Sequence, residues 1–268
     1  MMLTSHLTEQ ILEKLRLSCY PAMTVEGLAE TYRSWCRYVP FDNIRKRIMS
    51  SCDPLQPLPG ATAADFFTHW IKYGTGGTCW AGHGALHSLL ATLGFSVGYG
   101  ISTMLSDRTG LDNSPGHGTL TVKCEDKTFI TDATMLHGEP LPLQEWSSSH
   151  PVWGTRVHQH DGYWCVNWKP LGRSWLDCRL LATNVSDQEY PLRHERSRHN
   201  SRFDGALLIR LAGLDSISGI VKGEHVIRNS DGVETKASVT DDEQRKLLIE
   251  FYGISEEIVS LIPENQSA

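Results

Sequence analysis

The N-terminal third of the chain carries a helical pattern of apolar positions. Apolar side chains recur every three or four residues over residues 4–35, which predicts two amphipathic helices that are separated near Pro21. The same spacing predicts a third helix over residues 62–73 and a fourth over 79–93, which ends before Gly94. We therefore expect the N-terminal part to be a bundle of helices.

After Gly94 the pattern changes to short β-type runs. Strands are predicted at residues 96–101, 119–124, 128–132, 150–156 and 162–168. Asp126 and Lys127 separate two of these runs by the distance of a hairpin turn. Such a hairpin would bring His117, before its first strand, and Asp132, at the end of its second, to the same end of the sheet.

The C-terminal part has a mixed pattern. Residues 174–200 are polar and charged, and they are interpreted as either a helix over the barrel or a connection. Strands are expected at 205–211 and 225–228, and the acidic run at 240–243 predicts the start of a helix that continues through Tyr252 to Gly253.

The charge balance and the apolar runs exclude several classes of protein. A formal net charge of −6 gives no basic surface for nucleic acid or anionic membranes. The apolar stretch at 85–97 is interrupted by polar residues and is too short to span a bilayer. Glu9 and Glu13 interrupt the region where a signal peptide would have its apolar run. We expect a cytoplasmic protein without nucleic-acid or membrane partners, whose seven cysteines are reduced.

One cysteine differs from the other six in its surroundings. Cys79 follows the Gly76–Gly77 pair and opens a predicted helix, where free amide groups and the helix dipole are expected to lower the pKa of a thiol. The other cysteines are expected to be small hydrophobic side chains, with Cys52 in a loop. These six other cysteines are Cys19, Cys36, Cys52, Cys124, Cys165 and Cys178.

His117 and Asp132 can complete a catalytic group with this cysteine. A nucleophilic thiol needs a base, and the imidazole of the base needs an acceptor on its other nitrogen. Cys79, His117 and Asp132 can fill these three roles. The alternative is a surface histidine with an unrelated turn aspartate.

Other motifs have simpler interpretations. His83 and His87 lie four positions apart, but no glutamate follows His83, so a solvated or core pair is favoured over a zinc site. His158 and His160 alternate along a predicted strand, and the chain has no Cys-x-x-Cys pair. The glycine run at 74–77 is not followed by the Gly-Lys-Ser/Thr of a phosphate-binding loop. We therefore expect no metal.

The sequence resembles the arylamine N-acetyltransferase family over nearly its whole length. The resemblance rests on the nucleophile segment Gly76–Gly77–Thr78–Cys79, with His117 and Asp132 at separations similar to those of the family. Three further segments agree with it, and they are Val39–Pro40–Phe41–Asp42–Asn43, Leu93–Gly94–Phe95 and Asn200–Ser201–Arg202–Phe203. It implies an α+β fold with a cysteine-protease-like core: a helical bundle at 1–95, a central β-barrel at 96–203 and an α/β lid at 204–268.

The resemblance also implies a ping-pong acyl transfer. Cys79 would take an acetyl or other acyl group from acetyl-CoA or another acyl thioester and pass it to an arylamine or hydrazine, with His117 as base and Asp132 orienting it. Phe41 and Phe203 are expected to line the substrate pocket. Met135 stands where the family commonly has an aromatic residue, and it is the third expected pocket residue.

The sequence departs from the family around Cys79. Thr75 and Ala81 replace an arginine and a glutamate, and Trp80 replaces the more usual phenylalanine. Three alternatives therefore stay open. The chain could be an amide synthase that takes a longer acyl chain from a carrier protein in natural-product biosynthesis. It could be a cysteine hydrolase or transglutaminase, or a binding module without catalytic activity.

Overall fold

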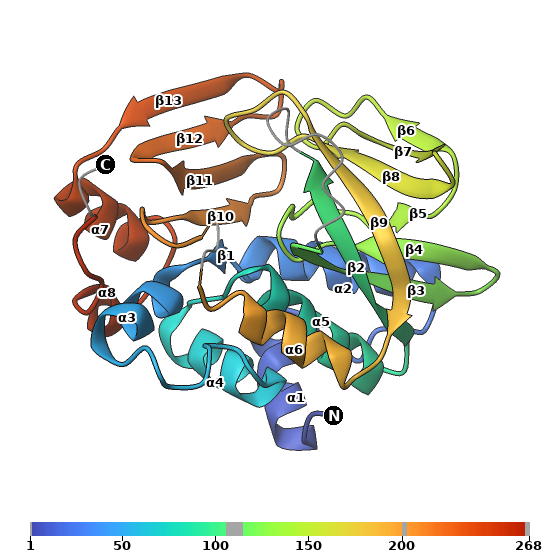
Figure 1. Cartoon of the computed structure of the whole chain (residues 1–268), viewed down its shortest axis with the longest axis horizontal. Helices are drawn as coiled ribbons and strands as arrows, with labels where there is room; N and C mark the ends of the chain where they lie inside the picture. The colour runs from blue at the N-terminus through green and yellow to red at the C-terminus, as the bar shows by residue number, and fades with distance from the viewer. Residues whose placement is uncertain (1, 106–114, 200–202, 266–268) are drawn as a thin grey trace.

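The computed structural model describes residues 2–105, 115–199 and 203–265. The described chain contains helices before, between and after its two sheets (Figure 1). The helices are α1 (Ser5–Lys14), α2 (Val25–Tyr38), α3 (Ile44–Cys52), α4 (Ala63–Tyr73), α5 (Cys79–Thr92), α6 (Glu189–Arg196), α7 (Asp241–Glu250) and α8 (Glu256–Val259).

The larger sheet has eight antiparallel strands and curls into a nearly closed barrel, in the order β5-β4-β3-β2-β9-β8-β7-β6. Its strands are β2 (Ser96–Leu105), β3 (His117–Cys124), β4 (Lys127–Thr131), β5 (Leu141–Pro142), β6 (Trp146–Ser148), β7 (Thr155–His160), β8 (Tyr163–Trp168) and β9 (Leu176–Val185). The α+β class and the central barrel are therefore confirmed.

The smaller sheet joins the two ends of the chain. Its order is β1-β10-β11-β12-β13, so a strand from the N-terminal part forms the edge of a C-terminal sheet (Figure 1). Its strands are β1 (Phe41–Asp42), β10 (Ile209–Ala212), β11 (Ile217–Val221), β12 (Glu224–Arg228) and β13 (Glu234–Ser238). We call this five-stranded sheet the lid sheet.

The helices predicted from the apolar pattern are present, although α2 continues to Tyr38 and α7 ends at Glu250, before the expected Gly253. The Thr62 side chain caps α4 by accepting from the Asp65 amide, and Gly74 ends this helix at a φ of 80°. Trp35, Phe66 and Trp70 pack together in the main core against α5. The capping box at Thr240 and Glu243 confirms the predicted start of α7.

The strand predicted at 150–156 is wrong in its first part. Residues 150–153 form a turn, in which the Gly154 amide donates to the His150 carbonyl at 2.7 Å, and β7 begins only at Thr155. Pro151 has no amide hydrogen to donate to a sheet ladder, and the His150 ring accepts from the Val152 amide instead. Similarly, the strand expected at 205–211 is β10, which begins at Ile209.

The polar segment at 174–200 contains a long strand as well as a helix. β9 pairs with both β2 and β8 in the middle of the barrel sheet, and α6 follows it and contacts α5. The sequence did not predict this strand, because three exposed polar side chains break the alternation of apolar and polar positions. These side chains are Asp177, Thr183 and Asn184. Its pairing with β2 is irregular between Tyr99 and Ser102.

No helix among the described residues is long and apolar enough to cross a membrane. All seven cysteines carry free thiols.

Candidate active site

The turn before Cys79 is held against β1. The Gly76 amide donates to the buried Asp42 carboxylate at 2.6 Å, and the Asp42 amide donates to the Gly77 carbonyl at 3.2 Å. A Cβ atom at Gly76 would lie only 1.8 Å from the Pro40 carbonyl oxygen. Glycine is therefore required there by close approach of two backbones. Burial raises the pKa of Asp42 to about 6.

Cys79 is the first residue of α5 and is 1% exposed. Burial raises the pKa of its thiol to about 12, although the amides of Gly118 and Trp80 act in the opposite direction. The expectation that the helix start alone favours a thiolate is therefore wrong, because desolvation outweighs the nearby amides. A thiolate at this position needs a proton acceptor beside it.

His117 and Asp132 meet as the β3–β4 hairpin predicts. His117 begins β3 and Asp132 follows the end of β4, and their Nε2 and Oδ2 atoms are 2.7 Å apart. An ionised carboxylate can only accept a hydrogen bond, so Nε2 carries the proton. Nδ1 keeps its lone pair, and it is the nitrogen of His117 that can take a proton from a thiol. Both side chains are almost fully buried.

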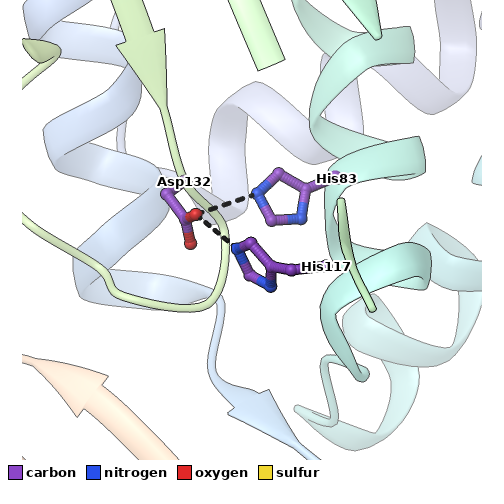
Figure 2. A group of neighbouring side chains, drawn as sticks. All are labelled: His83, His117 and Asp132. Carbon is purple, nitrogen blue, oxygen red and sulfur yellow. Dashed lines mark hydrogen bonds and ion pairs between the residues drawn. The ribbon is translucent and has the colours of Figure 1, made fainter. Parts of the chain in front are cut away.

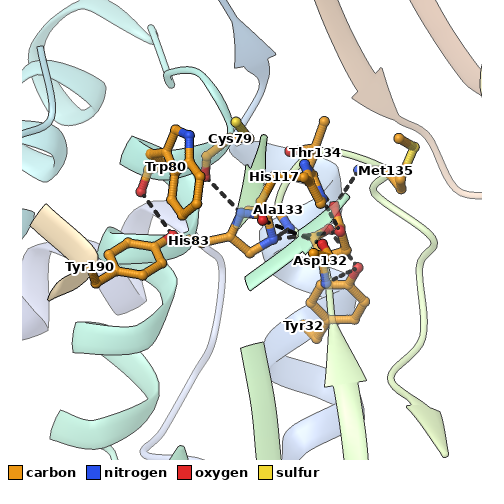
Figure 3. A network of polar contacts seen from close by, with 11 residues as sticks. Tyr32, Cys79, Trp80, His83, His117, Asp132, Ala133, Thr134, Met135 and Tyr190 are labelled. Carbon is orange, nitrogen blue, oxygen red and sulfur yellow. Dashed lines mark hydrogen bonds and ion pairs between the residues drawn. The ribbon is translucent and has the colours of Figure 1, made fainter. Parts of the chain in front are cut away.

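The Asp132 carboxylate is held on both oxygens. Its Oδ1 accepts from the amides of Thr134 and Met135, each at 2.8 Å. Its main chain is fixed by Tyr32 of α2, whose hydroxyl donates to the Asp132 carbonyl and accepts from the Asp132 amide (Figure 3). The Leu136 amide also donates to the Asp132 carbonyl at 3.3 Å, so five hydrogen bonds fix Asp132 apart from the bond to His117.

A second imidazole, that of His83, faces the same carboxylate (Figure 2). The Nε2 atom of His83 lies 3.6 Å from Oδ2 of Asp132 and accepts from the Ala133 amide at 3.0 Å. Its Nδ1 lies 2.7 Å from the Cys79 carbonyl, to which it donates. These two bonds fix a neutral imidazole with its proton on Nδ1. His83 therefore connects the first turn of α5 to the Asp132 loop.

The sequence pattern did not indicate the role of His83. It paired His83 with His87, but the His87 ring stacks on Tyr99, and burial lowers its pKa to about 4. The available signal was the spacing from Cys79, because a residue four positions into a helix lies one turn above the first. Tyr32 was also missed, and no local motif marked it; Asp42 lies in the segment 39–43 that supports the resemblance, but it was given no role in the site.

Electrostatics keep Asp132 ionised. Burial alone would raise its pKa, but His117, which donates to Oδ2, outweighs this and holds the pKa well below its usual range. The three side chains have ligand-type atoms within 4.8 Å of one another, as in a metal site. In this structure those atoms already bond one another or the Ala133 amide.

Two of the three expected pocket residues contact each other. The rings of Phe41 and Phe203 are 5.1 Å apart in an edge-to-face arrangement. Met135 donates its amide to Asp132, and its side chain packs against the hydrophobic cluster inside the barrel. The other residues of the expected 200–203 signature, Asn200, Ser201 and Arg202, lie outside the described residues.

The departures around Cys79 are accommodated in apolar surroundings. Thr75 and Ala81 are both enclosed, so a charge at either position would be buried. Trp80 packs edge-to-face on Tyr190 of α6, whose hydroxyl donates to the Trp80 carbonyl at 3.3 Å (Figure 3). The larger indole thus packs against the helix that follows β9.

Comparison with known proteins identifies the family. A family model described as N-acetyltransferase matches residues 24–259. The fold is similar to arylamine N-acetyltransferases from Mycobacterium marinum (TM-score 0.81, 14% identity, covering 95% of this chain and 98% of that one) and Salmonella typhimurium (0.80, 18%, 97% and 98%). The enzyme from Mycobacterium tuberculosis is also similar (0.81, 13%, 96% and 99%). No curated protein matches the sequence. The chain therefore belongs to the arylamine N-acetyltransferase family and is an N-acyltransferase.

Proposed function

We propose that this protein transfers an acetyl group from acetyl-CoA to an arylamine or hydrazine through a thioester on Cys79. The observation that carries the proposal is the 2.7 Å hydrogen bond between His117 and Asp132. This bond leaves Nδ1 of His117 as a base, in a residue whose neighbour Gly118 has its amide close to the Cys79 sulfur. The family membership supports the same donor and the same type of acceptor.

In the first half-reaction Nδ1 of His117 accepts the thiol proton, and Sγ of Cys79 attacks the thioester carbonyl carbon. The tetrahedral intermediate collapses, the bond to the sulfur of coenzyme A breaks, and that sulfur leaves with the proton from His117. Asp132 stabilises the imidazolium that exists between the two proton transfers. The buried thiol makes this proton transfer essential, because burial opposes a free thiolate.

In the second half-reaction the amine nitrogen attacks the carbonyl carbon of the acetylated Cys79. The nitrogen gives a proton to His117, the carbon–sulfur bond breaks, and Cys79 recovers its proton. Cys79 and His117 are 1% and 3% exposed, which favours an amine over water as the acceptor. We propose that Phe41 and Phe203 contact the acceptor, and that Met135 shapes the barrel side of the pocket.

Intact-mass measurement after incubation with acetyl-CoA tests the proposal. We expect a gain of one acetyl group that is lost in Cys79→Ala and kept in Cys178→Ala. Cys178 is a matched control, because it is also buried and burial also raises its pKa to about 12. Release of the coenzyme A thiol is followed in parallel, so that rapid hydrolysis of the thioester does not hide the adduct.

The outcomes separate the alternatives. An adduct that forms only from an acyl-carrier thioester would identify an amide synthase instead. Thiol release without transfer to any amine would identify a hydrolase. If neither donor gives an adduct or releases thiol, the acyltransferase proposal fails and a binding module remains.

A further inference from the structure

A cavity separate from Cys79 lies between α2, the barrel and the lid sheet. Its volume is about 250 Å³. Four parts of the chain form its walls: the C-terminal half of α2, the loop at 137–139, the segment at 146–153 that begins with β6, and the end of β10 with residues 213–215. The described residues that line it do not include Cys79, His117, Phe41 or Phe203. The cavity is therefore distinct from the proposed site of acetyl transfer.

Arg37 brings an unpaired guanidinium group to this cavity. Arg33 and Arg37 lie one helical turn apart on α2, and both line the same wall. Arg33 is paired with Glu139 at 3.3 Å. Arg37 makes no hydrogen bond or ion pair with any described residue, and its Nε is enclosed. Arg210 on β10 differs, because its guanidinium carbon lies 5.4 Å from the centre of the Phe41 ring and it does not line the cavity.

A second donor without a partner comes from Trp153. The Nε1 atom of its indole is enclosed and has no acceptor among the described residues. By contrast, Nε1 of Trp70 donates to the Tyr38 carbonyl at 2.8 Å. A buried donor without an acceptor costs free energy, because it has lost its hydrogen bonds to water. Arg37 and Trp153 thus each offer an N–H group that an acceptor on a ligand would satisfy.

Two indole rings supply flat apolar surface to the cavity. Gly138 has a φ of 86°, and a Cβ atom there would lie 3.6 Å from Cε2 of Trp153. The glycine therefore leaves this part of the Trp153 indole without a covering side chain. Trp146 also lines the cavity, with its ring 6.3 Å from that of His137. Indole faces beside a few polar groups are typical of a site for a small ligand with a flat ring.

The charges around the cavity favour an anionic ligand. His137 lines it, but burial lowers the pKa of this imidazole to about 4, so the ring is neutral at neutral pH. The side chains of Glu139 and Asp215 are exposed, so water can solvate both carboxylates. The enclosed donors of Arg37 and Trp153 need an acceptor instead. A carboxylate has two acceptor oxygens, which match the planar guanidinium and can also accept from an indole N–H.

We propose that this cavity is a second ligand site, which binds a small aromatic carboxylate. The acid group pairs with Arg37 and accepts from Nε1 of Trp153, and the ring packs against the indoles of Trp146 and Trp153. The site does not involve Cys79, so its ligand needs no amine and is not consumed by acetyl transfer. This inference is therefore independent of the proposed reaction.

The walls of this cavity belong to the two segments that hold Asp132. The Tyr32 hydroxyl bonds to the main chain of Asp132, and Cys36, one turn further along α2, lines the cavity (Figure 3). The loop at 137–139 follows Asp132 in the chain and lines the opposite part of the wall. A bound ligand would therefore connect α2 to the Asp132 loop and stabilise the folded chain.

Calorimetric titration with benzoate and benzamide tests the proposal. The two probes have nearly the same shape, and only benzoate is charged. We expect the unmodified protein to bind benzoate more tightly and to melt at a higher temperature in its presence. In Arg37→Gln the affinity for benzoate should fall about 10- to 100-fold, with little change for benzamide. Arg37→Lys keeps the charge without the planar group and should recover part of the loss.

Two further variants sharpen the test. Trp153→Phe keeps an aromatic ring and loses the Nε1 donor, so we expect the affinity for benzoate to fall about 3- to 10-fold. Arg156→Gln makes the same change as Arg37→Gln at an exposed position of β7 and should leave both probes unaffected. Thermal melting without ligand confirms that each variant is folded.

Three outcomes would overturn the proposal. Binding of benzoate that is lost in Phe203→Ala and kept in Arg37→Gln would place this probe in the proposed acceptor pocket. Inorganic phosphate that binds as tightly as benzoate and depends equally on Arg37 would show that the aromatic ring plays no part. If the unmodified protein binds benzoate no more tightly than benzamide, the cavity is not a carboxylate site. None of these measurements needs an acyl donor, so they can fail while acetylation of Cys79 is observed.

Discussion

Two neighbouring regions of this molecule hold a charged side chain in opposite ways, one fully buried and one half-buried. Around Asp132, the chain supplies an imidazole and two amides to the carboxylate, and a second imidazole lies close by. Around Arg210, the chain supplies an aromatic face and no hydrogen-bond acceptor among the described residues. The Asp132 carboxylate is therefore held in place before any substrate binds. The charge of Arg210 is instead left half-buried against an aromatic face.

A third buried group, His137, shows why the difference matters. Burial lowers its pKa to about 4, so this base gives up its proton at neutral pH. Arginine has no such option, since its pKa remains near 10 even after the effect of burial. Desolvation therefore leaves His137 neutral at neutral pH, whereas Arg210 keeps its charge.

The comparison predicts its largest effect at Asp132. In Asp132→Asn the amide NH₂ can face Nε2 of His117 and move the ring proton to Nδ1, where it blocks proton transfer from Cys79. We expect acetyl transfer to fall by about 10³- to 10⁴-fold, measured as release of the coenzyme A thiol. Asp161→Asn, at an exposed turn, should keep full activity. A loss below tenfold in Asp132→Asn would show that the partners of this carboxylate do not serve the reaction.

The next effect is expected at His83. His83→Ala removes the acceptor of the Ala133 amide and leaves a cavity beside Asp132. We expect a loss of about 2–4 kcal/mol in the free energy of unfolding, measured by denaturant titration. His87→Ala, one turn further along α5, should cost less because His87 is only partly buried and stacks on Tyr99. Equal losses in the free energy of unfolding for the two variants would show that His83 has no special role in supporting Asp132.

The smallest effect is a pH dependence at His137. Its folded-state pKa of about 4 lies below the unfolded value of about 6.5, so between these pH values the unfolded chain binds more protons. Stability from this residue is therefore present above pH 6.5 and is lost as the pH falls towards 4. His137→Gln should reduce the loss between these pH values by roughly 1–3 kcal/mol. His160→Gln, at an exposed ring, is the control. If the stability of His137→Gln depends on pH as that of the unmodified protein does, His137 is not the source of this pH dependence.

Local patterns predicted much of the fold and part of the site. Apolar spacing and capping residues located α4 and α5, and the hairpin turn between β3 and β4 brought His117 to Asp132. β9 was missed because its pairing with two neighbours outweighs its polar composition. The role of Tyr32 depends on its contact with Asp132, 100 positions further along the chain, which no local pattern contains.

The two-residue strand β1 links the order of folding to activity. Phe41 and Asp42 hold the glycine turn before Cys79 on one side and pair with β10 on the other. During synthesis Cys79 leaves the ribosome well before Ile209–Ala212 does, so β1 at first lacks its partner strand β10. The N-terminal helices can assemble early. β1, which contacts the turn before Cys79, gains its partner strand only after the C-terminal sheet has formed. A chain truncated before β10 would keep Cys79 and lack the strand that pairs with β1 beside it.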